Sequence, residues 1–189
     1  MSGTRVLGIA GWSGSGKTLL ITRLIPLLAK RGLRVATLKH AHHAFDVDVP
    51  GKDSYEHRKA GACEVIVSSA RRWAQMHELG EAAEATLPEL LRRLSPCDLV
   101  LVEGYKSEPH PKLEVFRRAL GKSPLYAADP RIIAIASDQD LPDASVPVVD
   151  LNDVPAVAQL VIERAEPLAD VLALLERAPS RPPRSPRAA

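Results

Sequence analysis

The sequence has little cysteine and no long apolar segment, and both shortages exclude classes of protein. Only Cys63 and Cys97 occur among the 189 residues, far apart and without the C-x-x-C spacing of redox or metal sites. Two free thiols in a reducing compartment are therefore expected. No apolar run approaches the roughly 18 residues that cross a bilayer, and the chain opens without the charged and apolar regions of a signal peptide. We therefore expect a soluble, cytoplasmic protein with no membrane contact.

The chain also lacks an excess of charge of either sign. Its formal net charge is +2. The tail, residues 179–189, contains three arginines and no acid, so the rest of the chain carries a formal charge of −1. Nucleic-acid binding therefore has no support from charge. The Pro/Arg/Ser-rich tail is expected to be disordered, either as a solubilising terminus or as a weak contact for an acidic partner.

The stretch from Gly11 to Thr18 is the most informative pattern in the sequence. It reads Gly-Trp-Ser-Gly-Ser-Gly-Lys-Thr and fits the phosphate-binding loop pattern G-x-x-x-x-G-K-[ST] without a mismatch. Its glycines let backbone N–H groups approach phosphate oxygens. Lys17 can reach the β- and γ-phosphates, which gives it a predicted catalytic part, and the Thr18 hydroxyl can ligate Mg²⁺. The predicted nucleotide contacts are Gly11, Gly14, Ser15, Gly16, Lys17 and Thr18.

Apolar runs and helical periodicity alternate along the chain. The apolar run 5–10 precedes the loop and leucines at helical spacing follow it, so the loop joins a strand to a helix as the motif requires. Further strands are expected at 33–38, 63–68, 73–79, 98–103, 113–116, 131–136 and 146–149. Helices are expected at 53–60, 86–94 and 153–177, the last interrupted near Pro167. This alternation predicts an α/β protein with a mostly parallel sheet covered on both faces, in one nucleotide-binding domain over residues 1–178.

Three acidic residues are candidates for the same site. Glu103 ends a strongly apolar strand, where P-loop proteins place an acid that helps to hold Mg²⁺; a solvated charge at the strand end is the alternative. Asp53 is a candidate to reach Mg²⁺ or to orient an attacking water, and it or Ser54 is suited to cap the following helix. Asp138 follows a late strand, and its carboxylate suits the N1–H and amino group of guanine. The Asn-Lys-x-Asp motif that is usual in guanine-specific P-loop proteins is absent, so an acidic loop residue without a binding role remains an alternative for Asp138.

The polar connection after the second strand is rich in histidine and aspartate. It follows a parallel strand directly, which places it on the ligand-binding edge of the sheet. A metal site, an anion or cofactor contact, and a plain polar loop all stay open, because the histidine spacing matches no standard zinc pattern. Trp12 in the phosphate loop could cover a nucleotide, pack on a dimer partner or fill surface space. The polar residues concerned are His40, His42, His43, Asp46 and Asp48.

Several segments, taken together and in this order, resemble one family. They are the loop 11–18, the segments 38–43 and 46–54, the Ala-Gly-Ala at 60–62, and 98–106. Over roughly residues 4–160 the chain resembles the MobB family of molybdopterin-guanine dinucleotide biosynthesis adaptor proteins. The phosphate loop alone is shared by many NTPases, and the His-rich and Gly-Lys-Asp-Ser segments make the resemblance specific.

The resemblance implies a three-layer P-loop NTPase fold similar to dethiobiotin synthetase and nitrogenase iron protein. It further implies binding of GTP with Mg²⁺, Glu103 at the Mg²⁺ site, slow hydrolysis at best and a homodimer. The implied partner is the guanylyltransferase that joins GMP to molybdopterin, with molybdopterin or its guanine dinucleotide as a further ligand. The region 39–53 would be a switch-like surface or the surface that faces molybdopterin. The sequence identifies no arginine finger, which agrees with a weak GTPase. The alternatives are a P-loop small-molecule kinase or ATP-dependent ligase, and a scaffold whose nucleotide is structural.

Overall fold

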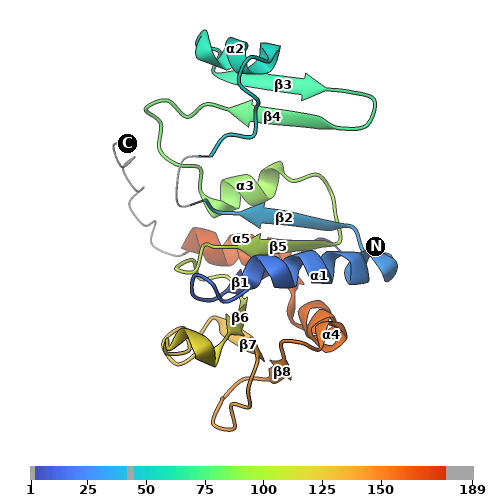
Figure 1. Ribbon diagram of the computed structural model, residues 1–189, viewed down its shortest axis with the longest axis vertical. Coiled ribbons are helices and arrows are strands. Elements are labelled where there is room, and N and C mark those ends of the chain that lie inside the picture. The colour runs from blue at the N-terminus through green and yellow to red at the C-terminus, as the bar shows by residue number, and fades with distance from the viewer. Residues whose placement is uncertain (1–2, 42–44, 178–189) are drawn as a thin grey trace. The chain divides into compact units, whose positions relative to one another are not determined.

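The computed structural model describes residues 3–41 and 45–177 and divides them into two compact units. The larger unit holds the described residues up to 40 and from 86 onward; the smaller unit holds residue 41 and residues 45–85. The elements are labelled in Figure 1. The predicted tail 179–189 lies outside the described residues.

The larger unit is built on a sheet with the strand order β2-β5-β1-β6-β7-β8. Every neighbouring pair in this order is parallel, and the two-residue β9 adds an antiparallel pairing to the start of β1. The carboxyl ends of the parallel strands therefore share one edge, and the loop that follows the central strand β1 lies in the middle of it. The strands are β1 (Arg5–Ala10), β2 (Val35–Lys39), β5 (Leu99–Glu103), β6 (Lys112–Phe116), β7 (Ile132–Ser137), β8 (Val148–Asp150) and β9 (Glu166–Pro167).

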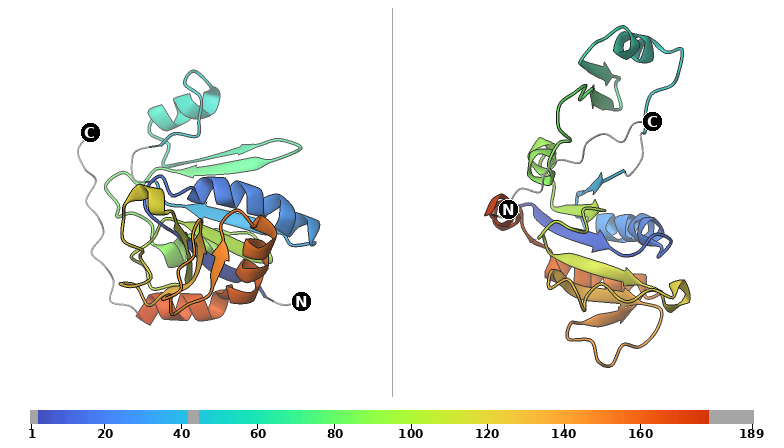
Figure 2. Two further views of the ribbon diagram at one scale, coloured as in Figure 1. Left: turned by 60° about the horizontal axis from the view of Figure 1, so that its bottom comes forward. Right: turned by 90° about the vertical axis from the view of Figure 1, so that its left-hand side faces the viewer.

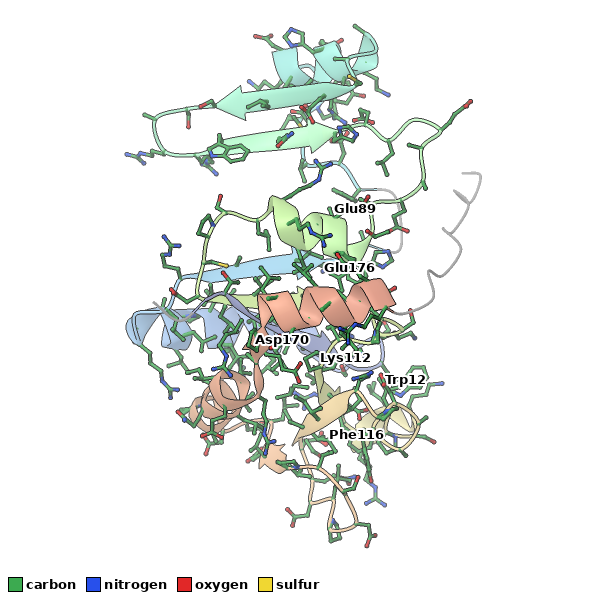
Figure 3. The ribbon with its side chains drawn as sticks, turned by 180° about the vertical axis from the view of Figure 1, so that it is seen from behind. Trp12, Glu89, Lys112, Phe116, Asp170 and Glu176 are labelled. Atoms are coloured by element: carbon green, nitrogen blue, oxygen red, sulfur yellow. The ribbon has the colours of Figure 1, made fainter. Side chains whose placement is uncertain are left out.

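Helices cover both faces of this sheet and confirm the predicted three-layer α/β architecture. Leu7 and Ile9 of β1 pack in one core with α1 and α4, whereas Val6 packs in a second core with α3 and α5, as the two-residue alternation of a strand requires. Figure 1 shows α1 in front of the strands, and Figure 3, from behind, shows α5 in front. The right-hand view in Figure 2 shows α1 and α5 on opposite sides. The helices are α1 (Lys17–Lys30), α3 (Leu87–Arg93), α4 (Val154–Arg164) and α5 (Leu168–Arg177).

Local signals in the sequence explain where several of these elements begin. The hydroxyl of Thr86 accepts the backbone N–H of Glu89, whose carboxylate in turn accepts the N–H of Thr86, so α3 starts in a capping box. The side chain of Asp153 caps α4 by accepting the backbone N–H of Ala156. Pro167 separates α4 from α5, as expected.

The smaller unit consists of α2 (Asp53–Lys59), β3 (Glu64–Ser68) and β4 (Trp73–His77). The two predicted strands are present, but they form a separate antiparallel pair and do not join the parallel sheet. The predicted cap of α2 is wrong, because Lys52 holds the N-cap position and no side chain caps the helix. The Ser54 hydroxyl instead donates to a carboxylate oxygen of Asp48, 2.9 Å away.

Candidate nucleotide-binding site

The loop between β1 and α1 has the backbone that the phosphate-loop motif demands. Gly11, Gly14 and Gly16 have φ values of 144°, 81° and 92°, a region that side chains with a Cβ rarely enter. A Cβ at Gly11 would lie 2.6 Å from the carbonyl oxygen of Val115. The side chain of Ser15 is fully buried, and its hydroxyl has no hydrogen-bond partner among the described residues. Position 11 therefore requires glycine, both for its positive φ and because there is no space for a Cβ.

Lys17 is the first residue of α1, and its ammonium folds back over the loop. Its Nζ donates to the carbonyl oxygens of Gly11 and Trp12, 2.9 and 3.0 Å away. Burial lowers the pKa of Lys17, the carboxylate of Glu103 opposes this shift, and the nearby cation of Lys106 adds to it. The ammonium thus stands at the start of a helix, where the helix dipole adds positive potential. Such a place suits an anion.

Thr18 and Glu103, the two predicted magnesium ligands, are brought together at the carboxyl ends of the neighbouring strands β1 and β5. The Thr18 hydroxyl donates to Oε1 of Glu103 at 2.9 Å, although the two residues are 85 positions apart in sequence. The ammonium of Lys39 lies 4.0 Å from the same carboxylate oxygen. A hydroxyl beside a carboxylate fits Mg²⁺, which takes hard oxygen ligands. Glu103 therefore faces the phosphate loop, and its side chain is only 13% exposed.

The chain segments that follow β2 and β5, two paired parallel strands, lie close together beside this carboxylate. The backbone N–H of His40 donates to the carbonyl oxygen of Glu103 at 2.9 Å. Gly104 has φ 93°, and a Cβ there would lie 2.8 Å from the Cβ of His40. Tyr105, also at positive φ, has its ring 4.8 Å from the imidazole of His40. Glycine at position 104 thus lets the chain turn away directly after the carboxylate.

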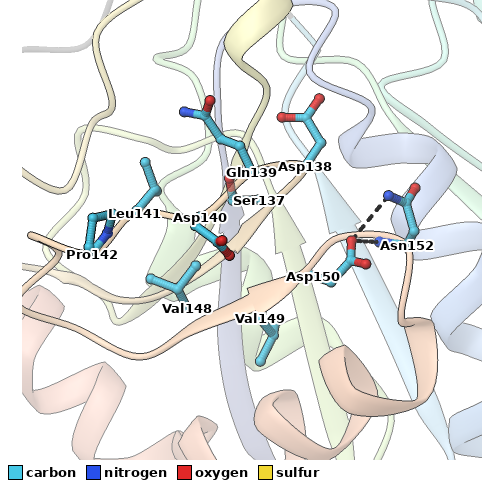
Figure 4. Close-up of a pocket in the computed structure, with 10 residues that line it drawn as sticks. All are labelled: Ser137, Asp138, Gln139, Asp140, Leu141, Pro142, Val148, Val149, Asp150 and Asn152. Carbon is cyan, nitrogen blue, oxygen red and sulfur yellow. Dashed lines mark hydrogen bonds between the residues drawn. The ribbon is translucent and has the colours of Figure 1, made fainter.

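A pocket lies further along the carboxyl edge of the sheet, at the ends of β7 and β8 (Figure 4). It has a volume of about 650 Å³ and carries several polar side chains. Asp138 is one of them: its Oδ1 accepts the backbone N–H of Arg118 at 3.2 Å. Asp150 accepts both the backbone and side-chain N–H groups of Asn152. Binding at the carboxyl ends of strands is the general rule for open α/β sheets, so this pocket and the phosphate loop are parts of one candidate site.

Two residues at this edge have contacts that the sequence did not indicate. Arg117, which directly follows β6, donates from Nε to the carbonyl oxygen of Ser15 at 3.0 Å. Trp12 is anchored, since its indole N–H donates to the carbonyl oxygen of Ser123 at 2.8 Å. The ammonium of Lys106 lies 5.2 Å from the centroid of the Trp12 indole, a cation–π geometry. The only sequence signal for Arg117 was its place after a short strand.

Asp46 and Asp48 of the smaller unit form ion pairs with the same arginine. Arg58 donates to Asp46 at 2.8 Å, to Asp48 at 3.4 Å and to Glu78 at 2.7 Å. The hydrogen bonds that Arg58 donates to Asp46 lower the pKa of this aspartate, and the hydrogen bonds that Arg58 donates to Asp46 and Glu78 raise the pKa of Arg58. Asp53 is exposed at the start of α2, and its predicted catalytic part stays a prediction.

The predicted histidine cluster is only partly described. His42 and His43 lie outside the described residues. Within residues 3–41 and 45–177, no group of three or more His, Cys, Asp or Glu side chains is placed to hold a metal ion. In the same part of the chain, none of the helices has the length and apolar character to cross a membrane.

The parallel sheet, the glycine-rich loop and the Thr18–Glu103 pair define a protein with the three-layer P-loop α/β fold. Comparison with known proteins identifies the family within this class. The profile of the family "Molybdopterin guanine dinucleotide synthesis protein B", MobB, matches residues 6–138. The molybdopterin-guanine dinucleotide biosynthesis adapter protein of Escherichia coli is 47% identical over 84% of this chain and 91% of its own length. The protein of the same name from Haemophilus influenzae is 40% identical over 82% of this chain and 86% of its own.

Solved structures of MobB proteins have the same fold as this chain. The crystal structure of Bacillus subtilis MobB superposes with a TM-score of 0.65 and 26% identity, covering 86% of this chain and 98% of that one. A crystal structure of molybdopterin-guanine biosynthesis protein B gives a TM-score of 0.61 and 27% identity, covering 84% of this chain and 97% of that one. The chain therefore belongs to the MobB family.

Proposed function

We propose that this protein binds GTP with Mg²⁺ at the phosphate loop and acts as an adapter in the biosynthesis of molybdopterin-guanine dinucleotide. The observation that carries the proposal is the meeting of Lys17, Thr18 and Glu103 at the centre of the carboxyl edge of the sheet. Residues that would hold a triphosphate and its metal lie there in one place.

The roles of the residues follow from their chemistry. The loop N–H groups and the start of α1 bind phosphate oxygens, and Lys17 exchanges its two carbonyl contacts for the β- and γ-phosphates. Thr18 and Glu103 would hold Mg²⁺, which when bound neutralises charge on the phosphates. The polar pocket beyond β7 takes the base, with Asp138 accepting the N1–H and amino hydrogens of guanine.

Hydrolysis at this site is expected to be slow. A dedicated arginine that stabilises the transition state contributes about 10³–10⁵ in rate in efficient phosphoryl-transfer enzymes. We assign none of the described arginines to that task. Arg117 donates to the Ser15 carbonyl, and this hydrogen bond holds the phosphate loop. A weak GTPase agrees with an adapter that holds nucleotide and does not consume it quickly.

The names of the relatives support the pathway part of the proposal. The Escherichia coli and Haemophilus influenzae relatives are both named adapter proteins of molybdopterin-guanine dinucleotide biosynthesis. An adapter acts beside an enzyme, so we infer that this chain assists the guanylyltransferase that joins the guanine nucleotide to molybdopterin. Molybdopterin or its guanine dinucleotide would then be a further ligand.

The smaller unit supports a homodimer. A two-stranded sheet is marginally stable by itself in water, and β3 and β4 expose the apolar side chains of Ile66, Val67 and Trp73. Phe45 and Val47 of the same unit are exposed as well. Covering such a surface favours association, and a second copy of the chain is the occupant that we infer.

Titration with Mg·GTP tests the nucleotide part of the proposal. Lys17→Ala should weaken binding tenfold or more, which corresponds to at least about 1.4 kcal/mol. Lys30→Ala is the matched control, because Lys30 is at the other end of α1 and should leave the affinity unchanged. Equal affinities of the wild-type protein and the Lys17 variant would refute the site. Rapid ATP turnover triggered by a metabolite would instead favour a kinase or ligase.

A further inference from the structure

Arg117 connects the phosphate loop to the pocket beyond β7. On one side its Nε donates to the carbonyl oxygen of Ser15 at 3.0 Å. On the other side its Nη1 lies 3.5 Å from Oδ2 of Asp138. One planar guanidinium therefore contacts both a backbone carbonyl in the loop and a carboxylate that lines the pocket.

The topology explains this bridging position. The phosphate loop follows β1, Arg117 follows β6, and Asp138 follows β7. These three strands are consecutive neighbours in the sheet, and their pairings are parallel. Arg117 is thus the side chain between the loop and the pocket at one shared edge.

The contact with the loop leaves little freedom. A Cβ at Gly16 would lie 3.6 Å from both Nε and Nη2 of Arg117, so the guanidinium packs against this glycine. The side chain of Arg117 is only 31% exposed and that of Asp138 only 24%. The other oxygen of Asp138 accepts the backbone N–H of Arg118. Asp138 is therefore held by Arg117 and Arg118, and Arg117 also reaches the phosphate loop.

The geometry leaves Asp138 able to bind a base as well. A carboxylate offers about four lone-pair directions, of which Arg117 and the N–H of Arg118 take two. A fixed carboxylate discriminates better than a mobile one, because its orientation is set before the ligand arrives. Arginine suits this task through its rigid fork of donors, which a lysine ammonium lacks.

We propose that Arg117 is a positioning residue for base selection: it fixes the Asp138 carboxylate relative to the phosphate loop, so that guanine is preferred over adenine only while this bridge is intact. The inference rests on the proposed binding of GTP at this site. It assigns the selectivity to the Arg117–Asp138 pair and not to Asp138 alone.

The test is a double-mutant cycle read as base discrimination. The β,γ-imido analogues of GTP and ATP are titrated with Mg²⁺ into the wild-type chain, Arg117→Met, Asp138→Asn and the double variant. The ratio of the two affinities is the readout. Both ligands carry the same triphosphate, so a general loss of positive charge or of loop order cancels from the ratio.

Three further variants and a stability measurement separate positioning from folding and from charge. Arg117→Lys keeps the charge but cannot span both contacts, so it should lose discrimination like Arg117→Met. Arg131→Met is the matched control, because exposed Arg131 precedes β7 while Asp138 follows it. Thermal unfolding of each variant verifies that it is folded. If Arg117→Met fails to fold, Arg117→Lys and Arg117→Gln carry the test.

The expected result is that Arg117→Met and Arg117→Lys lower the GTP-to-ATP affinity ratio by about fivefold or more, within the range of couplings between residues in contact. The double variant should be no worse than Asp138→Asn alone. An unchanged ratio in the Arg117 variants, or losses that multiply in the double variant, would overturn the inference and leave GTP binding intact. A wild-type chain that binds neither analogue would overturn the proposed function itself.

Discussion

His110 is a buried base whose titration should control the stability of the larger unit. Its side chain is fully buried just before β6, and neither ring nitrogen has a hydrogen-bond partner among the described residues. Burial, together with the neighbouring Lys112 cation, lowers the pKa of His110 from 6.5 to about 3, while Asp129 opposes the shift. Lys112 itself is paired with Asp129 at 2.9 Å. The folded protein therefore keeps the His110 imidazole neutral.

The size of the effect follows from proton linkage. The pKa of the His110 imidazole is 6.5 in the unfolded chain and about 3 in the folded chain. The unfolded state thus holds more protons between these values, and the free energy of unfolding falls as the pH falls through them. From pH 7.5 to pH 5 the loss due to His110 alone is about 2 kcal/mol, from 1.36 kcal/mol per pH unit.

Urea unfolding followed by circular dichroism at several pH values measures this loss. His110→Leu should retain about 2 kcal/mol more of its neutral-pH stability at pH 5 than the wild-type protein does. At pH 7.5 it should be as stable or more so, since it removes two unpartnered buried polar atoms. His57→Leu, which removes an exposed imidazole from α2, is the control. Parallel pH profiles for the wild-type protein and His110→Leu would refute the reasoning.

Two further predictions concern the carboxyl edge of the sheet. Glu103→Gln should raise the Mg²⁺ concentration that GTP binding requires by about tenfold, the scale of losing a partner around a metal site. Magnesium titrations measure this concentration, and an unchanged value would exclude Glu103 from the metal site. Gly104→Ala should cost about 1–3 kcal/mol of unfolding free energy, because φ is 93° and the new Cβ would lie 2.8 Å from His40. Gly121→Ala has open space around it and should cost less; equal losses in urea unfolding would contradict the steric argument.

Much of the fold could be predicted because its signals are local. The strand, glycine-rich loop and helix at 5–30 follow from an apolar run, a motif and a leucine periodicity. The capping box at Thr86 and the break at Pro167 mark further boundaries. The approach of Thr18 to Glu103 was predictable because the loop before Thr18 follows β1 and Glu103 ends β5, and the two strands are parallel neighbours.

Other features could not be read from the chain, for physical reasons. The sequences of β3 and β4 do not show whether these strands join the parallel sheet or, as in the structure, pair with each other. The strand 113–116 alternates in polarity, which is typical of a strand with one face in solvent. In the structure β6 is central, and its polar residues Lys112 and Glu114 are buried; Glu114 accepts the backbone N–H groups of Leu125 and Tyr126. Burial of that kind depends on tertiary contacts alone.

The most direct test of the central claim is a crystal structure of the chain grown with Mg²⁺ and a non-hydrolysable GTP analogue. We expect the phosphates to lie against the N–H groups of residues 13–18 with the Lys17 ammonium beside them, Mg²⁺ at Thr18 and Glu103, and the guanine in the pocket beyond β7. A glycine-rich loop left empty, with the nucleotide bound elsewhere on the molecule, would contradict this claim.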